Sequence, residues 1–304
     1  IRPKRVFFMP QTNSRILRLQ DAIEFFILDC QSRRLTRSTL SFYKNRLGTF
    51  VAWCNERQIQ NLADIDTHTV KRFLVHCQGR NLSDQYQHGL ARAIKAFLRY
   101  CERDGLIDAA PKVVMPKLEK RILTALTPDE VKKILAVAPT DRDKAIVLTL
   151  LDTGLRASEL CALTIADLDF DTGTITVRQG KGQKQRVVPI GTRARKAVRR
   201  YLLERPDAKP TEPLFASQRG GKHLRLDGLV QMMDRLGAKS GVEHCTAHTF
   251  RRTFAISCLR NGMNIHILAR IMGHSDISVL RQYLDFVEND ITGAHEKASP
   301  ADNL

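Results

Sequence analysis

Apolar residues recur three and four positions apart through the first third of the chain. This spacing places them on one helix face, so it predicts four helices. The four apolar stripes are Leu19, Ile23, Phe26 and Cys30; Leu40, Tyr43, Leu47, Phe50 and Cys54; Val70, Phe73, Leu74 and Cys77; and Tyr86, Leu90, Ile94, Phe97 and Cys101. Asp66 is suited to cap the third helix, and Gly79 and Gly105 end the third and fourth. Residues 15–108 are therefore predicted to form an all-α domain, preceded by a basic lead over residues 1–14.

The stretch over residues 109–121 shows no helical period. It contains Pro111 and Pro116 among four basic residues, Lys112, Lys117, Lys120 and Arg121. Proline disfavours helix in the residue before it, so this composition predicts an extended basic linker. A second domain is expected over residues 122–304, because 304 residues exceed the usual size of one domain.

The second domain is predicted to open with a capped helix, because Thr127, Pro128 and Glu130 fit a capping box with proline at the first helical position. Further helices are expected over residues 143–152, 193–203, 227–237, 246–261, 264–272 and 275–284.

Between residues 167 and 188 the hydrophobic period changes from helical to two. Leu168 and Phe170 alternate with aspartates, and Ile175 and Val177 alternate with threonines. Such alternation, broken by glycine turns, predicts a small three-stranded antiparallel meander. The fold class expected for the chain is thus mainly α with a small antiparallel β-sheet, and the second domain is α+β.

The charge is strongly positive and unevenly placed. The formal net charge is +17, and residues 1–121 hold 22 Lys+Arg against 11 Asp+Glu. Such an excess indicates a polyanionic partner, most simply nucleic acid, although a merely basic surface is the alternative. The concentration of charge in the N-terminal part predicts that this part grips a phosphate backbone.

Two helix faces are predicted to supply the phosphate contacts. Four cations, Arg92, Lys95, Arg99 and Arg103, recur opposite the apolar stripe of the fourth helix. Arg37 and Lys44 hold the same relation to the second helix. The alternative is an ordinary solvated face, but few acidic residues intervene, which favours DNA contacts.

The seven cysteines include no Cys-x-x-Cys pair and mostly fall on apolar helix faces. Buried free thiols in a reducing cytoplasm are predicted, with neither a metal site nor disulfides. No apolar run approaches the roughly 20 residues that span a bilayer, so no membrane partner is expected.

The last half of the chain collects cations suited to attack on a phosphodiester. The transition state places extra negative charge on the nonbridging oxygens, so an enzyme working without a metal needs fixed cations. Arg156 follows a glycine at a predicted helix start, with Glu159 on the same face to orient it. His248 and Arg251 also share a helix face, and an arginine fork can hold two phosphate oxygens at once.

Three further residues complete a candidate set. Tyr283 offers a phenol nucleophile, which needs nearby cations or a base because its ordinary pKa is near 10. Lys181 lies between glycines at a hairpin tip, where it can act as a general acid. His274 follows a glycine at a helix junction and can donate to the phosphate. Each residue alone has an ordinary structural explanation, but their order along the chain favours the catalytic one.

The sequence resembles the tyrosine recombinases, also called the phage integrase family, over residues 15 to about 290. The matching motifs are Gly154-Leu155-Arg156-Ala157-Ser158-Glu159-Leu160, the hairpin from Gly180 to Pro189, His248-Thr249-Phe250-Arg251, and Met272-Gly273-His274-Ser275 followed by Tyr283. The N-terminal part matches only as a helical, basic core-DNA-binding domain of the SAM-like type.

The resemblance implies a role for each residue. Tyr283 would attack the scissile phosphate and leave a 3′-phosphotyrosine and a free 5′-hydroxyl. Arg156 and Arg251 would clamp the nonbridging oxygens. His248 would accept the tyrosine proton and His274 would bond the phosphate.

The resemblance also implies that Lys181 protonates the leaving oxygen, and that no cofactor, neither ATP nor metal, is needed. Four protomers on two inverted-repeat core sites would exchange strands through a Holliday junction, with accessory proteins in some systems. The segment after Tyr283 would dock on a neighbouring protomer. A cytoplasmic, nucleoid-associated protein is expected.

The subfamily is less well determined by the sequence. Resolvases of the Xer type usually carry Tyr-x-His, whereas Tyr283 is followed by Leu284 and Asp285. The lead over residues 1–14 is too short for an arm-binding domain. These departures favour the integrase of a mobile element, with Xer-like dimer resolution as the alternative. A type IB topoisomerase would share the nucleophile and the clamp, but the two-domain layout and the motifs resemble recombinases more closely. An inert DNA-binding protein is less favoured because all six residues are present.

Overall fold

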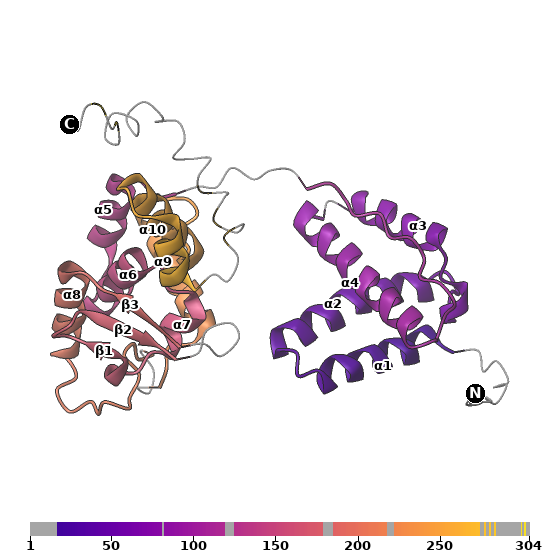
Figure 1. Cartoon of the computed structure of the whole chain (residues 1–304), viewed down its shortest axis with the longest axis horizontal. Helices are drawn as coiled ribbons and strands as arrows, with labels where there is room; N and C mark the ends of the chain where they lie inside the picture. The colour runs from indigo at the N-terminus through magenta and orange to yellow at the C-terminus, as the bar shows by residue number, and fades with distance from the viewer. Residues whose placement is uncertain are drawn as a thin grey trace. The chain divides into compact units, whose positions relative to one another are not determined.

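The computed structural model describes residues 17–80, 82–118, 125–178, 185–217 and 222–273, together with residues 277, 280, 283, 299 and 301. The chain divides into two compact units, residues 1–121 and 122–304 (Figure 1). Each unit has a hydrophobic core of its own.

The first unit is a bundle of the four predicted helices. They are α1 (Leu19–Ser32), α2 (Arg37–Asn55), α3 (Thr67–Gln78) and α4 (Asp84–Arg103), with a short 3-10 helix over Leu62–Asp64. Oxygen-bearing side chains cap three of these helices: Thr36, Asp66 and Ser83 each accept a backbone N–H of the first turn. The predicted cap at Asp66 is therefore confirmed.

The core of the first unit is aromatic. Phe50, Phe73 and Phe97 are fully buried, and Phe50 and Phe73 meet edge to face with ring centroids 5.0 Å apart. The predicted burial of cysteines is confirmed for six of the seven, Cys258 being half-buried. Burial raises the pKa of Cys54 and of Cys101 to about 12, so these thiols stay protonated and pack as small apolar groups.

The stretch predicted as a linker has no regular structure over residues 111–118. Its first part nevertheless packs on the first unit, because Val113 is buried in that core. Two backbone amides hold it there: Ala110 donates to Glu102 and Lys112 donates to Thr67. Helical spacing gave no sign of this attachment, since the apolar run from Val113 to Met115 stands between two prolines and shows no period.

The second unit combines helices with a small sheet. Its described helices are α5 (Pro128–Val137), α6 (Asp141–Thr153), α7 (Ala157–Ala162), α8 (Thr192–Leu202), α9 (Leu226–Ser240), α10 (Ala247–Arg260) and α11 (Ile265–Met272), with a 3-10 helix over Ile165–Asp167. The capping box of Thr127 and Glu130 forms as predicted. The helix expected over residues 275–284 lies mostly outside the described residues.

The sheet is the predicted antiparallel meander, in the order β1 (Leu168–Asp169), β2 (Thr174–Val177) and β3 (Arg186–Pro189). Ile175 pairs with Leu168 on one side and with Val188 on the other, and all three side chains are buried. The first strand is shorter than predicted, because Asp169 accepts the amides of residues 171 and 172 and turns the chain early.

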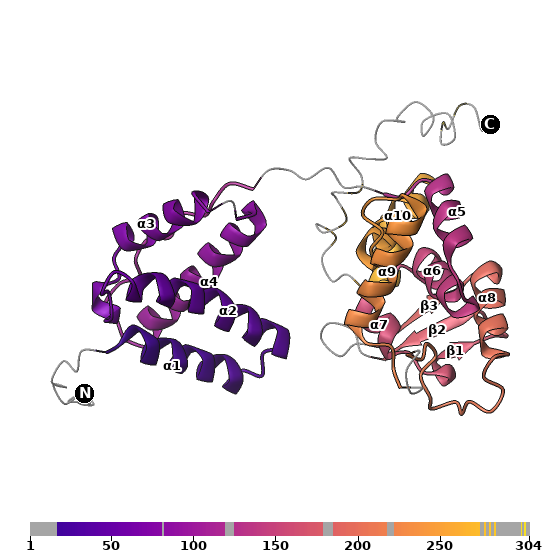
Figure 2. The same ribbon diagram turned by 180° about the vertical axis from the view of Figure 1, so that it is seen from behind.

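Helix α6 lies between α8 and α10, as both views of the molecule show (Figures 1 and 2). Helix α11 packs against α10 and β3. The predicted fold class, mainly α with a small antiparallel sheet, is confirmed. Within the described part of the chain, no helix combines the length and apolar character needed to cross a membrane.

Candidate active site

The end of α6 brings the first arginine into place. Gly154 ends this helix in the left-handed conformation, with φ of 58°, and a Cβ there would lie 2.3 Å from the ring of Phe254 on α10. The close approach lets α10 pass directly over the turn. Arg156 then lies at the N-terminus of α7, where its side chain is 29% exposed.

Glu159 is the acceptor at the centre of the site. Its buried carboxylate accepts the backbone amide of Arg156 at 2.8 Å and the guanidinium of Arg156 at 2.8 Å. It also receives both terminal nitrogens of Arg186, at 2.8 and 2.7 Å. Burial by itself would raise the pKa of Glu159, but these hydrogen bonds and charges outweigh it and lower the pKa to about 2.

Arg251 lies one helical turn into α10 and is buried. Thr246 caps this helix by accepting the amide of Thr249 at 3.1 Å. The guanidinium of Arg251 donates to the carbonyls of Gly154 and Met272. Burial, and then the charge of Arg156, lower its pKa to about 10, so it remains a cation at neutral pH.

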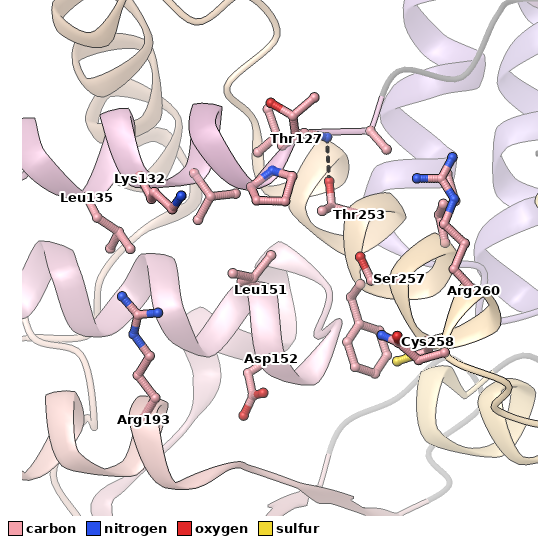
Figure 3. Close-up of a pocket in the computed structure, with 17 residues that line it drawn as sticks. Thr127, Lys132, Leu135, Leu151, Asp152, Arg193, Thr253, Ser257, Cys258 and Arg260 are labelled. Atoms are coloured by element: carbon pink, nitrogen blue, oxygen red, sulfur yellow. Dashed lines mark hydrogen bonds between the residues drawn. The ribbon is translucent and has the colours of Figure 1, made fainter.

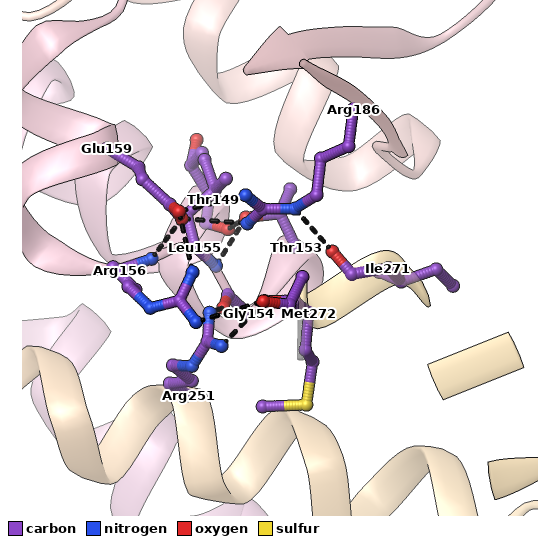
Figure 4. A network of polar contacts seen from close by, with 11 residues as sticks. Thr149, Thr153, Gly154, Leu155, Arg156, Glu159, Arg186, Arg251, Ile271 and Met272 are labelled. Atoms are coloured by element: carbon purple, nitrogen blue, oxygen red, sulfur yellow. Dashed lines mark hydrogen bonds and ion pairs between the residues drawn. The ribbon is translucent and has the colours of Figure 1, made fainter. Parts of the chain in front are cut away.

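Three arginines converge on the C-terminal end of α11. Arg186 donates to the carbonyl of Ile271 at 2.8 Å, Arg251 to that of Met272 at 2.7 Å, and Arg156 to that of Gly273 at 3.2 Å (Figure 4). The last carbonyls of a helix lack partners within the helix and carry partial negative charge. These three arginines, Arg156, Arg186 and Arg251, form the arginine cluster. They fix this helix end against α7, α10 and β3.

His248 lies in the first turn of α10, at an exposed position. Desolvation by the surrounding protein, and then the charges of Arg252 and Arg251, lower the pKa of its imidazole. The neutral form is favoured, and neutral imidazole can accept a proton. Arg252 follows one helical turn after His248 on the same face, and its buried Nε donates to no acceptor among the described residues.

Tyr283 is buried, with 3% of its surface exposed. It belongs to a small apolar cluster with Phe254, Leu268 and Met272 of α10 and α11. Burial raises the pKa of its phenol, while the charges of Arg252 and Arg251 act to lower it. The tyrosine therefore lies close to Arg251 and Arg252, both of which α10 carries.

The structure brings Arg156, His248, Arg251 and Tyr283 to one side of the second unit. The other two predicted residues, Lys181 and His274, lie outside the described residues. Arg186 and Arg252 were not predicted. The signal for Arg186 was weak, because a lone arginine at a strand end has no period, whereas Arg252 stands one turn from His248 and could have been noticed.

The cations predicted to contact DNA lie on α2 and α4 of the first unit. Arg37, Lys44, Arg92 and Arg99 are exposed and Lys95 is half-buried. The guanidinium of Arg92 lies over the ring of Phe42, 4.6 Å from its centroid, so α4 places this cation against α2.

The contacts of two arginines change the basic face that was predicted for the first unit. Arg103 donates to Asp29 and to Asp104, each at 2.9 Å, so its charge is already balanced. Arg46, which the sequence did not single out, lies 3.7 Å from the ring centroid of Tyr86 on α4. The pairing of Arg103 is with α1, which helical spacing along α4 cannot show.

A cavity of about 890 Å³ lies between α5, α6, α8 and α10 (Figure 3). Leu135 and Leu151 contribute apolar surface to it, and Lys132, Arg193 and Arg260 line it as well. The residues of the arginine cluster do not line this cavity. It is therefore a separate feature of the second unit, with a largely apolar lining that also holds these three basic residues and the acidic Asp152.

The arrangement suits the chemistry of a phosphodiester. Two guanidiniums, of Arg156 and Arg186, bind one carboxylate, and the guanidinium of Arg251 lies near them on backbone carbonyls, which leaves an excess of positive charge fixed by protein contacts. Fixed cations stabilise the charge that develops on a phosphate under attack. A neutral histidine and a phenol lie on the neighbouring helices.

Comparison with family models assigns both parts of the chain. The model described as the phage integrase family matches residues 124–289, and the model described as the phage integrase N-terminal SAM-like domain matches residues 23–105. The arginine cluster and Tyr283 fall within the first match.

Similar proteins and structures agree with these matches. The chain is 35% identical over 243 residues to the tyrosine recombinase XerA of Thermococcus kodakarensis, covering 79% of this chain and 85% of that protein. It is 30% identical over 294 residues to the tyrosine recombinase XerC of Pelobacter propionicus, covering 93% and 96%. The fold resembles the Tn1549 transposon integrase in complex with circular intermediate DNA, with a TM-score of 0.72 at 23% identity, covering 86% and 94%.

Proposed function

Because the chain belongs to the phage integrase family, the tyrosine recombinases that cut and rejoin DNA at specific sites, we propose that it does so with Tyr283 as nucleophile. The observation that carries this proposal is the cluster of Arg156 and Arg251 beside Tyr283, built from α7, α10 and α11. The matches to the two family models confirm the family resemblance seen in the sequence.

In the proposed reaction the phenol oxygen of Tyr283 attacks the phosphorus, and the bond from phosphorus to the 5′-oxygen breaks. The phenol proton passes to His248, whose lowered pKa supports a neutral acceptor. Arg156 and Arg251 hold the nonbridging oxygens, His274 donates to the phosphate, and Lys181 protonates the 5′-oxygen. Attack by a 5′-hydroxyl on the phosphotyrosine reverses these steps and rejoins DNA without ATP.

We assign the first unit, residues 15–108, as the core-DNA-binding domain and residues 122–304 as the catalytic domain with a C-terminal tail, joined by the linker over residues 109–121. The match of the SAM-like model to residues 23–105 supports this assignment. The exposed cations of α2 and α4 would hold the phosphates of a double-stranded core site. The protein would act in the cytoplasm, on the DNA of the nucleoid.

We further propose that four protomers assemble on two inverted-repeat sites. The cavity between α5 and α10 supports this step, because the sequence after Tyr283 is complementary to it. That sequence contains the apolar Phe286, Val287 and Ile291 among acidic residues. The lining of the cavity is largely apolar and holds three basic residues against one acidic residue, Asp152. The tail of one protomer would dock in the cavity of the next.

The biological role is proposed to be integration of a mobile element, because Tyr283 is not followed by the histidine usual in Xer resolvases. A second role, resolution of chromosome dimers, is supported by the similarity to XerA and XerC. Accessory proteins would set the direction in either case. The position of the target sites distinguishes the two roles. Integration would use sites at the ends of an element, whereas dimer resolution would use one site per replicon.

Covalent capture tests the proposal. Sheared DNA of the host is incubated with the protein and with Tyr283→Phe, and DNA that stays attached after denaturation is sequenced. Attachment only to the unmodified protein, concentrated at inverted repeats, is the expected result.

Three outcomes would contradict the proposal. Equal attachment to Tyr283→Phe would exclude this residue as nucleophile. Attachment at scattered positions would indicate a topoisomerase, and tight binding without any covalent product would indicate an inert DNA-binding protein.

A further inference from the structure

Arg186 has every nitrogen of its guanidinium committed to protein acceptors. Its terminal nitrogens donate to the two carboxylate oxygens of Glu159 at 2.8 and 2.7 Å, and its Nε donates to the carbonyl of Ile271 at 2.8 Å. Only 12% of its side chain is exposed. Three of its five N–H groups donate to protein acceptors, and both terminal nitrogens bind the carboxylate of Glu159, so its part in the site is exerted through Glu159.

The carboxylate of Glu159 is shared between two arginines. It accepts two hydrogen bonds from Arg186 and two from Arg156, and a carboxylate offers about four acceptor positions. All four positions are therefore filled. Without Arg186, half of them would be open, and the carboxylate would be free to turn fully onto Arg156.

The charge balance leads to the same conclusion. Glu159 and Arg156 alone would make a neutral pair, with little attraction for an anion. Arg186 adds a second cation to the same carboxylate and restores a net positive charge next to Arg156. The carboxylate of Glu159, shared with Arg186, then competes less strongly with the phosphate for the terminal nitrogens of Arg156.

Arg186 also contacts the end of α11. A Cβ on Gly273 would lie 3.1 Å from both Cζ and a terminal nitrogen of Arg186, so the guanidinium lies flat against this glycine. Figure 4 shows Arg186 reaching from β3 to Glu159 on one side and to Ile271 on the other. The side chain thus connects the strand to α7 and to the helix end that Arg156 and Arg251 bind.

We propose that Arg186 is a positioning residue for DNA cleavage: it occupies Glu159 and the end of α11, and so keeps Arg156 oriented and free for the scissile phosphate. This inference rests on the proposed function, because it concerns the same site. It predicts that the defect of an Arg186 variant arises from the free carboxylate of Glu159.

The test uses single-turnover cleavage of the duplex recovered by covalent capture, at saturating protein. Arg186→Gln is expected to cleave about 100-fold more slowly with little change in DNA affinity, and Arg186→Lys should be intermediate because it keeps the charge without the fork. Arg178→Gln is the matched control, since Arg178 is an exposed arginine of the same hairpin that pairs with Asp167 instead.

The decisive variant is the double substitution Arg186→Gln with Glu159→Gln. If the free carboxylate captures Arg156, removing its charge should restore cleavage at least roughly tenfold over Arg186→Gln alone. A merely structural role would make the double variant as slow or slower, and that result would overturn the proposal. Cleavage by Arg186→Gln within threefold of the unmodified protein would overturn it too.

Failure of the proposed function would look different, because the unmodified protein would then form no covalent product with the same duplex. If Arg186→Gln does not fold, comparing Arg186→Lys with its double variant carrying Glu159→Gln gives the same test. Circular dichroism of each variant at the assay temperature establishes that it is folded.

Discussion

Arg252 differs from the other arginines near Tyr283, because its Nε is buried and donates to no acceptor in the described part of the chain. Its charge acts to lower the pKa of both His248 and Tyr283. Burial acts in the opposite direction on Tyr283 and prevails. Arg252 therefore limits how far the pKa of the nucleophile rises.

We predict that Arg252→Ala raises the pKa of Tyr283 further. The phenolate then forms only at higher pH, so the alkaline rise of the cleavage rate should move to higher pH. At neutral pH the rate should fall roughly tenfold. A pH profile of single-turnover cleavage measures this shift, with Arg235→Ala, an exposed arginine of α9, as control. An unmoved profile would show that Arg252 does not act on the phenol.

Glu159 provides a prediction about stability. Its pKa of about 2 lies below the ordinary value of 4.5, so its ionised form stabilises the fold. This contribution is fully present above about pH 4.5 and is lost as the pH falls toward 2. The shift corresponds to a free energy of about 3 kcal/mol.

Glu159→Gln should therefore lower the free energy of unfolding by about 3 kcal/mol at pH 7, and by roughly half as much at about pH 3, because the carboxylate is still largely ionised in the folded protein there. Urea unfolding followed by circular dichroism measures both values. Trp53, the one tryptophan of the chain, lies in the first unit and reports that unit separately. Asp129→Asn, which removes an exposed ion pair with Lys132, should have almost no effect. An equal loss at both pH values would contradict the assignment.

The turn between α6 and α7 decides how closely α10 approaches the site. Gly154 has a positive φ and faces the ring of Phe254, whereas Gly241 ends α9 with φ of 68° and open space around it. The two glycines thus share the backbone conformation but differ in their surroundings.

We predict that Gly241→Ala costs about 1 kcal/mol from the backbone alone. Gly154→Ala should cost about 2 kcal/mol more, because its methyl group would overlap the ring of Phe254. Urea unfolding of the two variants compares these costs. Equal losses of unfolding free energy in the two variants would show that α10 can move away from the turn freely. Cleavage by Gly154→Ala should also be slower, because the arginine cluster separates when α10 moves.

The basic face of the first unit is expected to act when the whole protein binds DNA. We predict that Arg92→Gln, Lys95→Gln and Arg99→Gln each lower the slope of log affinity against log salt by about 1. Arg103→Gln should change the slope less, because two carboxylates already balance its charge. Binding to the captured duplex between about 50 and 200 mM salt tests this difference. Slopes equal to that of the unmodified protein in all four variants would remove α4 from the DNA interface.

Assembly of protomers on DNA tests whether the cavity of the second unit receives the tail of a neighbouring protomer. Leu135→Glu places a charge in its apolar lining and should abolish recombination between two sites while leaving single-site binding intact. Leu203→Glu is the control, because Leu203 is 76% exposed outside the cavity. Recombination by Leu135→Glu at the level of this control would show that the cavity receives no neighbour. Sedimentation of the protein on DNA measures the assembly itself.

The sequence by itself determined the helices, the meander and the family. Helical spacing marks one face whatever lies opposite it, and Asp66, Thr127 and Glu130 form their caps within one turn of chain. The family motifs are likewise local strings of residues. These features depend on neighbours within a few positions, so a single sequence carries them in full.

Only the tertiary structure decided which charges remain available. Arg103 looked like a free cation along α4, yet Asp29 of α1 binds it. Arg186 looked like an ordinary strand residue, yet it shares Glu159 with Arg156 and holds the end of α11. Val113 looked like linker and is core. Pairing between residues distant in sequence depends on how helices pack, and packing is a property of the folded chain that periodicity cannot express.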